Sequence, residues 1–496
     1  MTPIVETDAG RWAGLETRGV VEFLGISYAA APFGEHRFMP PQPVTPWAGV
    51  RRAVRFGPTV PKTRLSPHLE RMFPERWIDG EDCLNLNIWA PAQRTSLSPV
   101  LVWIHGGGFT NGSSSSRELD GSAFARDGVV CVTVNYRVGA DGFLSLGDGI
   151  ANVGLQDQLA ALKWVQRNIS AFGGDPARVT LAGHSAGGSS VVCLLASPMS
   201  SGLFSRAISQ STSGIHRLTS PEVALRVGLD LAARLDVAPT RAALAEVPKR
   251  AFLAAVDQQL RDLASGTPDS WGSEARTMAP WAPTMDGAVI PRQPVREVAS
   301  GRGRTVPLLT GTARDEVRVH LTPEYLDTLT ERELSEQVRR YGRTPSEIAP
   351  YRASRPGASP GDLLAAVAGD WYFRIPTVRL AEARHQGGAA DTWMYRFDRP
   401  LPEENDRYGA GHGAEVPFVF DTISVEETHP RIGARPSAEV AEFIHGLWVD
   451  FIKGQDPCWA AYEPDTRTTA LLSDTLTAVE DPDGCERIVW SDSFIN

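Results

Sequence analysis

Gly-His-Ser-Ala-Gly occupies residues 183–187, directly after the apolar run Val-Thr-Leu-Ala at 179–182 and before the small residues Gly-Ser-Ser-Val-Val at 188–192. This order predicts a strand, a sharp turn and a helix, with Ser185 at the turn. Small residues on both sides of a serine allow the backbone to bend tightly enough to expose the hydroxyl at the start of a helix. Ser185 is therefore the candidate nucleophile.

A second glycine-x-serine-x-glycine match, Gly-Ala-Ser-Pro-Gly, lies at residues 357–361. No strand signal precedes it. The proline after its serine, Pro360, also lacks the backbone N–H that such a turn would offer to an oxyanion. We interpret this second match as a loop without a catalytic role.

Composition restricts the class of protein. The chain has 496 residues, of which 42% are hydrophobic and 22% charged, with 13 Trp, so a sizeable core is expected. The formal net charge is −10 and no run of Lys or Arg appears, so nucleic acid is not an expected partner. Nowhere do 18 apolar residues run together, and the N-terminus lacks an export pattern, so we expect no membrane contact and a cytoplasmic location. A monomer is expected.

The five cysteines are scattered along the chain and odd in number, and no pair has metal-ligand or redox spacing. We expect them to be reduced and expect no metal site. Two of them, Cys131 and Cys193, lie in apolar runs and are predicted to be small core residues.

Strand and helix signals alternate along the chain. β-branched and aromatic runs predict strands, and apolar residues near helical spacing from 152 to 169 predict a helix that stops at Phe-Gly-Gly-Asp-Pro. Because a strand and the sharp turn follow this helix, the order indicates a largely parallel sheet flanked by helices. The expected strands lie at 20–28, 84–89, 100–104, 129–135, 306–310 and 392–397.

One catalytic domain over residues 1–496 is the expected organisation. The Ala-, Leu- and Arg-rich segment 219–265 has helical periodicity, and the Gly/Pro/Trp-rich stretch 266–293 is expected to be a loop. We expect these segments to form an inserted helical cap at about 215–300. A persistent apolar helix face spans 440–452 and ends at Gly454.

Oxyanion donors are expected in the sequence His-Gly-Gly-Gly-Phe at 105–109, which follows the strand at 101–104. Three glycines allow the backbone to turn its N–H groups inward with no Cβ in the way. The amides of Gly107 and Gly108, with that of Ala186 just after the nucleophile, are the predicted oxyanion hole.

The general base is expected well after Ser185 in the chain. His412 lies in a glycine-rich loop, 409–413, that follows the strand at 392–397, and it is favoured over the other histidines. The orienting acid should lie between the serine and the histidine, after the strand at 306–310. Both Asp315 and Glu316 could serve, and spacing alone does not separate them.

Taken together, these segments resemble the type-B carboxylesterase family of α/β-hydrolases, which includes bacterial nitrobenzyl esterases. The resemblance covers nearly the whole chain and is densest in four segments, Glu-Asp-Cys-Leu-Asn-Leu-Asn at 81–87, Asn-Tyr-Arg-Val-Gly at 135–139, Gly-Leu-Gln-Asp-Gln at 154–158 and Phe-Gly-Gly-Asp-Pro at 172–176. It implies an α/β-hydrolase fold with a mostly parallel twisted sheet and an inserted cap.

The same resemblance implies the catalytic residues. It places the family's nucleophile on Ser185, its acid on Glu316 and its base on His412. It also implies that Ser211 hydrogen-bonds the acid. Two structural ion pairs are implied as well, Arg37 with Glu81 and Arg137 with Asp157.

Two departures from the family pattern affect the site and the cysteines. His184 replaces the usual glutamate before the nucleophile, so we interpret it as a residue lining the cleft with less negative potential than usual. Cys83 has no upstream cysteine, whereas secreted members pair the corresponding residue. An alignment with the family also puts the small residues Thr277 and Ala279 near the acyl pocket, which implies room for a larger acyl group.

The predicted activity is hydrolysis of small-molecule carboxylic esters through an acyl-enzyme on Ser185, with no cofactor. Some bacterial members of the family hydrolyse aryl carbamates or anilides, so the same residues leave that alternative open. A non-catalytic binding protein of the same fold is a second alternative, although such members typically lack the serine. A lipase acting at interfaces is a third, and it would need a large apolar lid.

Overall fold

The alternating strand and helix pattern builds a central sheet in the computed structural model. The structure describes residues 2–213, 218–265, 280–389, 391–399, 401 and 403–492. The predicted acyl-pocket residues Thr277 and Ala279 lie outside these ranges, as does part of the expected cap. The described residues form one sheet of eleven strands and a small sheet of three.

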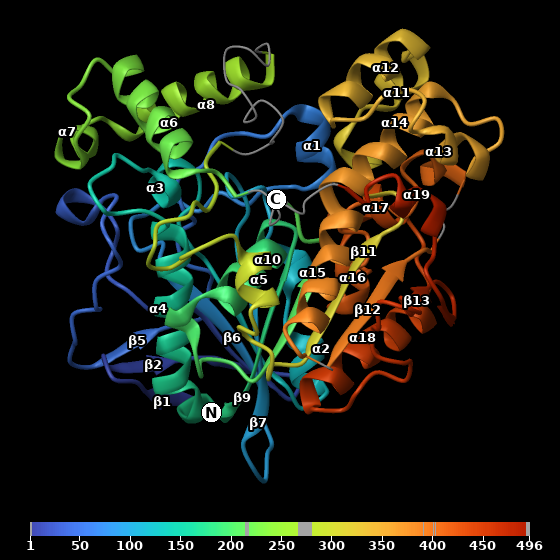
Figure 1. Cartoon of the computed structure of the whole chain (residues 1–496). Coiled ribbons are helices and arrows are strands. Elements are labelled where there is room, and N and C mark those ends of the chain that lie inside the picture. The colour runs from blue at the N-terminus through green and yellow to red at the C-terminus, as the bar shows by residue number, and fades with distance from the viewer. Residues whose placement is uncertain are drawn as a thin grey trace.

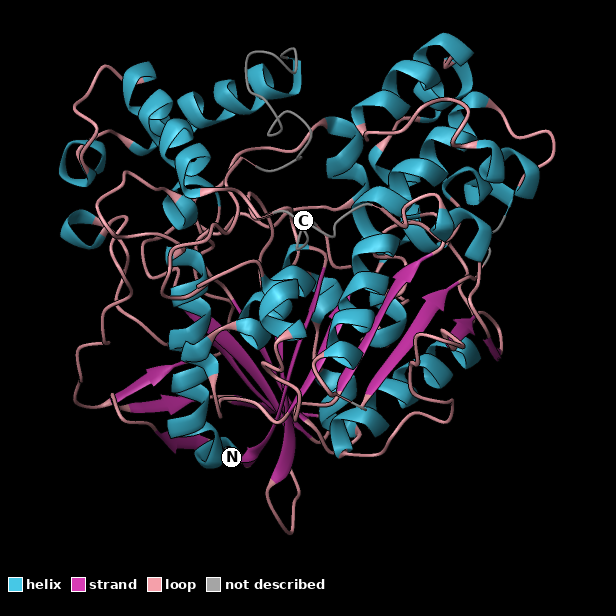
Figure 2. Ribbon diagram, in the orientation of Figure 1, coloured by secondary structure: helices cyan, strands magenta, loops and turns pink. Residues whose placement is uncertain are grey.

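The large sheet is parallel in its centre and antiparallel at both edges (Figure 2). Its strands, in spatial order, are β14 (Leu476–Val479), β13 (Thr469–Leu472), β12 (Thr392–Phe397), β11 (Leu308–Ala313), β10 (Arg206–Gln210), β9 (Gly174–His184), β7 (Ser98–Ile104), β8 (Val130–Val134), β6 (Asn85–Pro91), β4 (Val20–Ser27) and β3 (Leu15–Thr17). The small sheet contains β1 (Ile4–Glu6), β2 (Arg11–Ala13) and β5 (Val50–Arg52). The expected parallel sheet flanked by helices is confirmed.

Each central strand is buried on both faces, as a parallel sheet covered by helices requires. In β7 the side chains alternate between two separate cores: Val100, Val102 and Ile104 belong to one, and Leu101 and Trp103 to the other. The first core includes residues of α4 (Val153–Asn168), α5 (Ala186–Ala196), α10 (Pro294–Ala299) and α15 (Ile375–Gln386). The second includes residues of α2 (Ser122–Arg126), α16 (Val416–Val419) and α18 (Ala438–Lys453).

Two further groups of helices stand beyond the carboxyl ends of the central strands, with α1 (Pro67–Met72) between them (Figure 1). One group, upper left in the view, contains α6 (Pro221–Arg234), α7 (Arg241–Ala245) and α8 (Lys249–Ser265). The other, upper right, contains α11 (Pro323–Thr328), α12 (Glu331–Arg340), α13 (Ala349–Ser354) and α14 (Pro360–Gly369). The other short α-helices of the described residues are α3 (Gly139–Phe143), α17 (His429–Ile432) and α19 (Gly484–Ile488).

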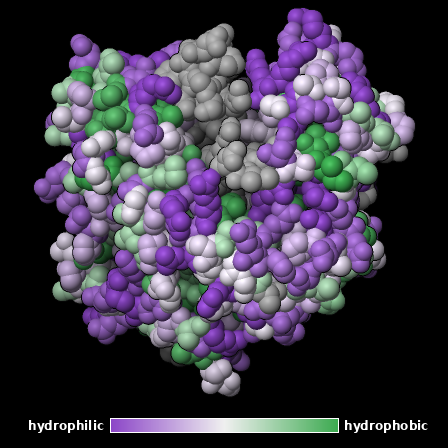
Figure 3. All heavy atoms as spheres, in the orientation of Figure 1, coloured by the Kyte–Doolittle hydropathy of each residue, from purple (hydrophilic) through white to green (hydrophobic). Residues whose placement is uncertain are grey.

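The face of the molecule in Figure 3 is mainly hydrophilic, and its hydrophobic areas are small and separate. Apolar side chains are accordingly gathered in the buried clusters beside the sheet. Among the described helices, none has both the length and the apolar character that crossing a bilayer requires. Cys131 and Cys193 are buried and free, as their apolar surroundings predicted.

Local signals explain the helix ends. In α18 the side chain of Ser437 accepts a hydrogen bond from the amide of Val440, and Gly454 ends the helix in a left-handed conformation with φ 98°. In the second serine match, Ser359 caps α14, and its side chain and that of Asp362 each bond the other's amide. The interpretation of that match as non-catalytic therefore agrees with a structural role for its serine.

One implied ion pair is confirmed. Arg137 and Asp157 are fully buried and joined through two side-chain contacts of 2.8 and 2.6 Å, and Asp157 also accepts the amide of Arg137. This pair ties the segment after β8 to α4.

The other implied ion pair is wrong. Arg37 contacts Asp141 at 3.1 Å, and its guanidinium also donates to the carbonyl of Val247 at 3.0 Å. Glu81, the expected partner, is exposed to solvent. Asp141 is buried, so leaving it without a cation would cost more than leaving Glu81 hydrated.

Removal of one member of the buried pair should destabilise the fold strongly. Asp157→Ala leaves the guanidinium of Arg137 buried without its carboxylate, and we expect a loss of about 3–5 kcal/mol in the free energy of unfolding. Glu336→Ala is the control, because Glu336 pairs with Arg332 on the exposed face of α12; it should cost less than about 0.5 kcal/mol. Denaturant midpoints measure both, and equal shifts would contradict the assigned role of the pair.

Candidate active site

The turn at Ser185 joins β9 directly to α5. Ser185 has φ 58° and ψ −122°, a conformation that side-chain-bearing residues rarely adopt. Its amide donates to the carbonyl of Gln210 on β10 at 2.9 Å. At Gly187 a Cβ would lie 2.0 Å from the carbonyl oxygen of Ile104, so this glycine is required where α5 crosses the end of β7. The neighbouring strands thus hold the serine in its strained conformation.

The glycine loop after β7 lies against this turn. A Cβ on Gly106 would approach the Cβ of Ser185 to 3.1 Å. Gly107 has φ +112°, and its carbonyl accepts the amides of Thr110 and Asn111 at 3.0 and 2.9 Å. Within the described residues, no hydrogen bond uses the N–H groups of the three predicted oxyanion donors, Gly107, Gly108 and Ala186. These amides therefore remain available to a ligand beside Ser185.

The imidazole of His412, in the loop after β12, contacts the carboxyl of Glu316, which follows β11. Its Nδ1 lies 2.5 Å from Glu316 Oε2, and both side chains are almost fully buried. Glu316 is the first residue of η6 (Glu316–His320), directly after β11, and its Oε1 accepts the amide of Ala313 at 2.8 Å. The parallel strands β11 and β12 bring the two residues together, because the loops after both strands leave the same edge of the sheet.

The structure separates the two candidate acids. Asp315 accepts the amide of Ala410 at 3.1 Å and is bridged to Arg318, so it supports the backbone of the loop that carries His412. Glu316 is the carboxyl that contacts the imidazole itself.

Burial shifts both members of the histidine and glutamate pair toward their uncharged forms. It raises the pKa of Glu316 and lowers the pKa of His412, and the buried guanidinium of Arg431 lowers the pKa of His412 further. The imidazole of His412 is therefore kept ready to accept a proton rather than to carry one.

Ser211 lies close to Glu316, and its hydroxyl acts to lower the pKa of that carboxyl. The Ser211 oxygen makes no hydrogen bond of good geometry among the described residues. Ser211 and Glu316 are therefore close to each other, but the implied hydrogen bond between them is not well aligned.

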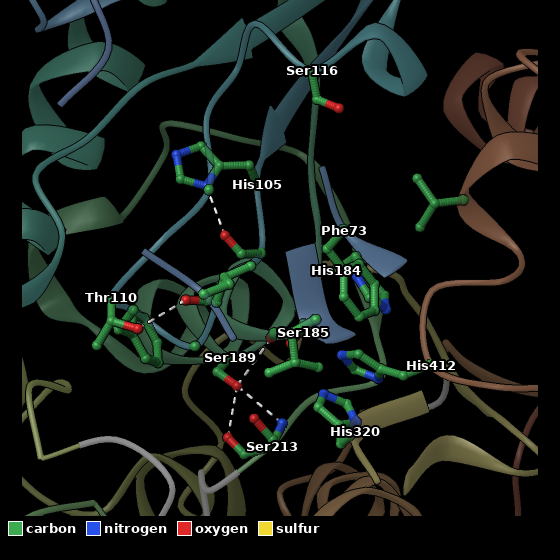
Figure 4. Close-up of a pocket in the computed structure, with 18 of the residues that line it drawn as sticks. Phe73, His105, Thr110, Ser116, His184, Ser185, Ser189, Ser213, His320 and His412 are labelled. Atoms are coloured by element: carbon green, nitrogen blue, oxygen red, sulfur yellow. Dashed lines mark hydrogen bonds between the residues drawn. The ribbon is translucent and has the colours of Figure 1, made fainter. Parts of the chain in front are cut away.

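Ser185 and His412 line the same cavity, together with the glycine loop, residues of α1 and the segment that follows it, and His320 at the end of η6 (Figure 4). The cavity holds about 320 Å³ and its walls are mostly apolar. No hydrogen bond joins Ser185 Oγ to His412 within the described chain, and such contacts often close only when substrate binds. The described residues also contain no cluster of His, Cys, Asp or Glu arranged to hold a metal ion.

A π-helical turn, η7 (Asp370–Arg374), connects α14 to α15 and supplies one wall of the cavity. Its three consecutive aromatic residues, Trp371, Tyr372 and Phe373, all line the cavity. A regular α-helix turns 100° per residue and would disperse three consecutive side chains, whereas the wider π turn keeps them closer together. Sequence reasoning did not identify these residues, because a π turn has no period that the sequence displays.

Two further histidines lie beside His412. The ring of His184 is centred 4.4 Å from that of His412, and the ring of His320 is centred 5.0 Å away (Figure 4). His184 lines the cavity, as expected. The sequence did not predict that His320 lies beside His412. The only signal was that His320 follows the strand β11, and this does not distinguish it from other histidines in the chain.

The strain at Ser185 predicts that glycine at this position stabilises the protein. Ser185→Gly removes the Cβ that disfavours φ 58°, and we expect a gain of about 1 kcal/mol in the free energy of unfolding. Ser185→Ala keeps the Cβ and is the control, expected to leave stability nearly unchanged. Thermal denaturation of both variants compares them, and equal midpoints would show that the turn is not strained.

Comparison with known proteins places the chain in a family. The model of the Carboxylesterase family matches residues 1–475. The para-nitrobenzyl esterase of Bacillus subtilis (strain 168) is 35% identical over 98% of this chain and 97% of its own length. The phenmedipham hydrolase of Pseudarthrobacter oxydans is 32% identical, with 95% of each chain covered.

A solved structure agrees with this result. The crystal structure of the Geobacillus stearothermophilus carboxylesterase EST55 superimposes with a TM-score of 0.84 at 36% identity, and the match covers 98% of this chain and all of that one. Since the family model and relatives above 30% identity cover almost the whole chain, this protein belongs to the carboxylesterase family.

Proposed function

We propose that the chain is a serine carboxylesterase in which Ser185, His412 and Glu316 act as nucleophile, general base and orienting acid. The observation that carries this proposal is the contact of 2.5 Å between His412 and Glu316 in the cavity that Ser185 also lines. As a member of the family, the chain is a carboxylic ester hydrolase, which argues against the non-catalytic alternative.

In the acylation step the Ser185 oxygen attacks the ester carbonyl carbon while His412 takes the hydroxyl proton. Glu316 orients the imidazole and stabilises the imidazolium that forms. The negative oxygen of the tetrahedral intermediate is held by the amides of Gly107, Gly108 and Ala186, with further support from the N-terminal end of α5. When the intermediate collapses, His412 returns the proton to the departing alcohol.

Deacylation repeats the same proton transfers with water. His412 removes a proton from a water molecule, the resulting hydroxide attacks the acyl carbon, and the bond to Ser185 breaks with return of the proton to the serine oxygen. The products are one alcohol and one carboxylic acid for each ester and each water consumed. No organic cofactor or metal enters these steps.

The segment at about 215–300 is proposed to act as a cap over this cavity. Leu218, Thr219, Ala282 and Pro283 line the cavity. Helices α6 to α8 also contribute side chains to the core that packs against the sheet, so the cap and the sheet form one domain in this proposal. The expectations of a cytoplasmic location and a monomeric state stay predictions.

Loss of the nucleophile is the direct test of the proposal. Ser185→Ala should lower kcat on nitrophenyl acetate, butyrate and octanoate by about 10⁴-fold or more, because no group then forms the acyl-enzyme. A matched aryl carbamate in the same series tests the alternative reaction that uses the same residues. Near wild-type hydrolysis by the alanine variant would contradict the mechanism, and a dominant carbamate rate would favour the alternative.

Ester hydrolysis should also require the observed position of the glycine loop at 105–109. A Cβ on Gly107 would lie 2.3 Å from the carbonyl oxygen of Asn111, so Gly107→Ala must displace the oxyanion amides. We expect kcat to fall about 10²- to 10³-fold. Gly149→Ala is the matched control: Gly149 also has a positive φ, +84°, but faces open space, so strain without displacement should leave kcat unchanged. Equal losses would assign the effect to general destabilisation.

A further inference from the structure

The imidazole of His412 is surrounded by uncharged rings. Ring centroids lie at 4.4 Å for His184, 4.6 Å for Phe373 and 5.0 Å for His320, and Phe73 adds an edge contact at 6.3 Å. His184 makes the shortest of these contacts, and it is also the residue next to the nucleophile in the chain. It therefore touches the general base while its backbone belongs to the turn that exposes Ser185.

Two glycines bring the backbone of neighbouring loops close to His184. A Cβ on Gly106 would lie 2.9 Å from the carbonyl oxygen of His184 and 3.6 Å from its Nδ1. A Cβ on Gly413 would lie 3.1 Å from the Cε1 atom of the same ring. The ring is thus fixed between the oxyanion loop and the loop that carries His412. Its Nε2 is buried without a hydrogen-bond partner among the described residues.

Charges around His184 and His412 are few in the described part of the chain. Burial lowers the pKa of His184 and that of His320, so both rings are uncharged near neutral pH. Arg431 is buried, donates to the carbonyl of Gly413 and pairs with Glu118. The titratable or charged groups that contact the two rings or line the same cavity are Glu316 and His320 on η6, Arg431 on α17, Glu118 on η2 (Arg117–Leu119), Glu75 after α1 and His105 after β7, and Glu415 before α16 lies near Glu316.

Glu316 is thus the carboxyl in contact with His412, and two carboxyls that line the same cavity are engaged by cations. Glu118 is engaged by Arg431, and Glu75, which lines the same cavity, is engaged by Lys62. Burial and the proximity of Glu316 raise the pKa of Glu415 to about 8.

We propose that His184 is a positioning residue, whose uncharged ring packs against His412 and keeps the imidazole directed at Glu316 on one side and at Ser185 on the other. The inference rests on the proposed catalytic function of those three residues. An ionised side chain at position 184 would act in two ways. A carboxylate there would stabilise the imidazolium form of His412, and it would compete with Glu316 for the ring proton.

The first experiment separates the charge of the residue from its shape. His184→Glu and His184→Gln introduce side chains of nearly equal size that differ in charge. We expect the acid limb of the kcat/KM profile, which reports loss of neutral His412, to lie about 1–3 pH units higher in the glutamate variant than in the glutamine variant. The direction follows because a neighbouring anion raises the pKa of an imidazole. Coincident acid limbs in two folded variants would overturn the proposal.

A second pair of variants tests the packing of the ring. His184→Ala removes it and should lower kcat about tenfold, since small displacements of a catalytic group are costly. His184→Phe restores a ring without a titratable nitrogen and should recover kcat to within about threefold of the wild type. If alanine and phenylalanine lower kcat equally, the ring does not position His412 and the proposal is wrong.

A measurement without turnover distinguishes failure of this inference from failure of the proposed function. The imidazole of His412 is titrated by NMR in Ser185→Ala protein with labelled histidine, and its signal is assigned by its loss in His412→Gln. In this background, a higher His412 pKa in His184→Glu than in His184→Gln supports the inference even if ester hydrolysis is not serine-dependent. An equal His412 pKa in the two variants, combined with serine-dependent hydrolysis by the wild type, would overturn the inference and leave the proposed function standing.

Discussion

The contact between α5 and the end of β7 is the constraint on which the site depends. Gly187 brings the helix so close to the carbonyl of Ile104 that no side chain fits between them. Ser185, two residues before Gly187, is consequently held at a positive φ. Its amide donates a hydrogen bond to the carbonyl of Gln210 on β10. The sheet therefore supports a strained turn with two of its buried central strands, and a turn at a flexible edge would not be restrained in this way. This packing places the hydroxyl of Ser185 at the carboxyl ends of the central strands.

Burial explains how the neighbouring groups acquire suitable protonation states. Glu316 and His412 are each unfavourable as isolated charges in this interior, and their direct contact satisfies both. Asp315 supports the same loop through its backbone, which leaves the next carboxyl free to face the imidazole. Two adjacent acidic residues thus have separate tasks, one in holding the loop and the other in contacting the ring.

The walls of the cavity show how much of a site arises from residues without reactive groups. The π turn η7 directs three consecutive aromatic side chains toward the cavity, and Phe373 packs on His412. His184 and His320 extend this uncharged surrounding, and low polarity strengthens the interactions of the few charges that remain. The same walls limit access of water to the imidazole. Their mostly apolar character suits an acyl or alcohol group of moderate size.

Much of the fold and part of the site could be predicted from the sequence, because they depend on local pattern. The turn at Ser185, the glycine loop and the helix ending at Gly454 each follow from small residues beside an apolar run. The extension of β11 to Ala313, three residues past the expected end, was not predictable, since pairing with β10 and β12 decides it. The partner of Arg37 was predicted wrongly for a related reason: burial of Asp141 depends on how α3 packs.

By itself, then, the sequence determined the order of strands and helices and the candidate residues of the site. Only the tertiary structure showed that Glu316, which the family resemblance had implied, contacts His412, and it alone decided that His184, His320 and Phe373 surround that ring. Those contacts join segments far apart in the chain, and their energies depend on burial that no local pattern records.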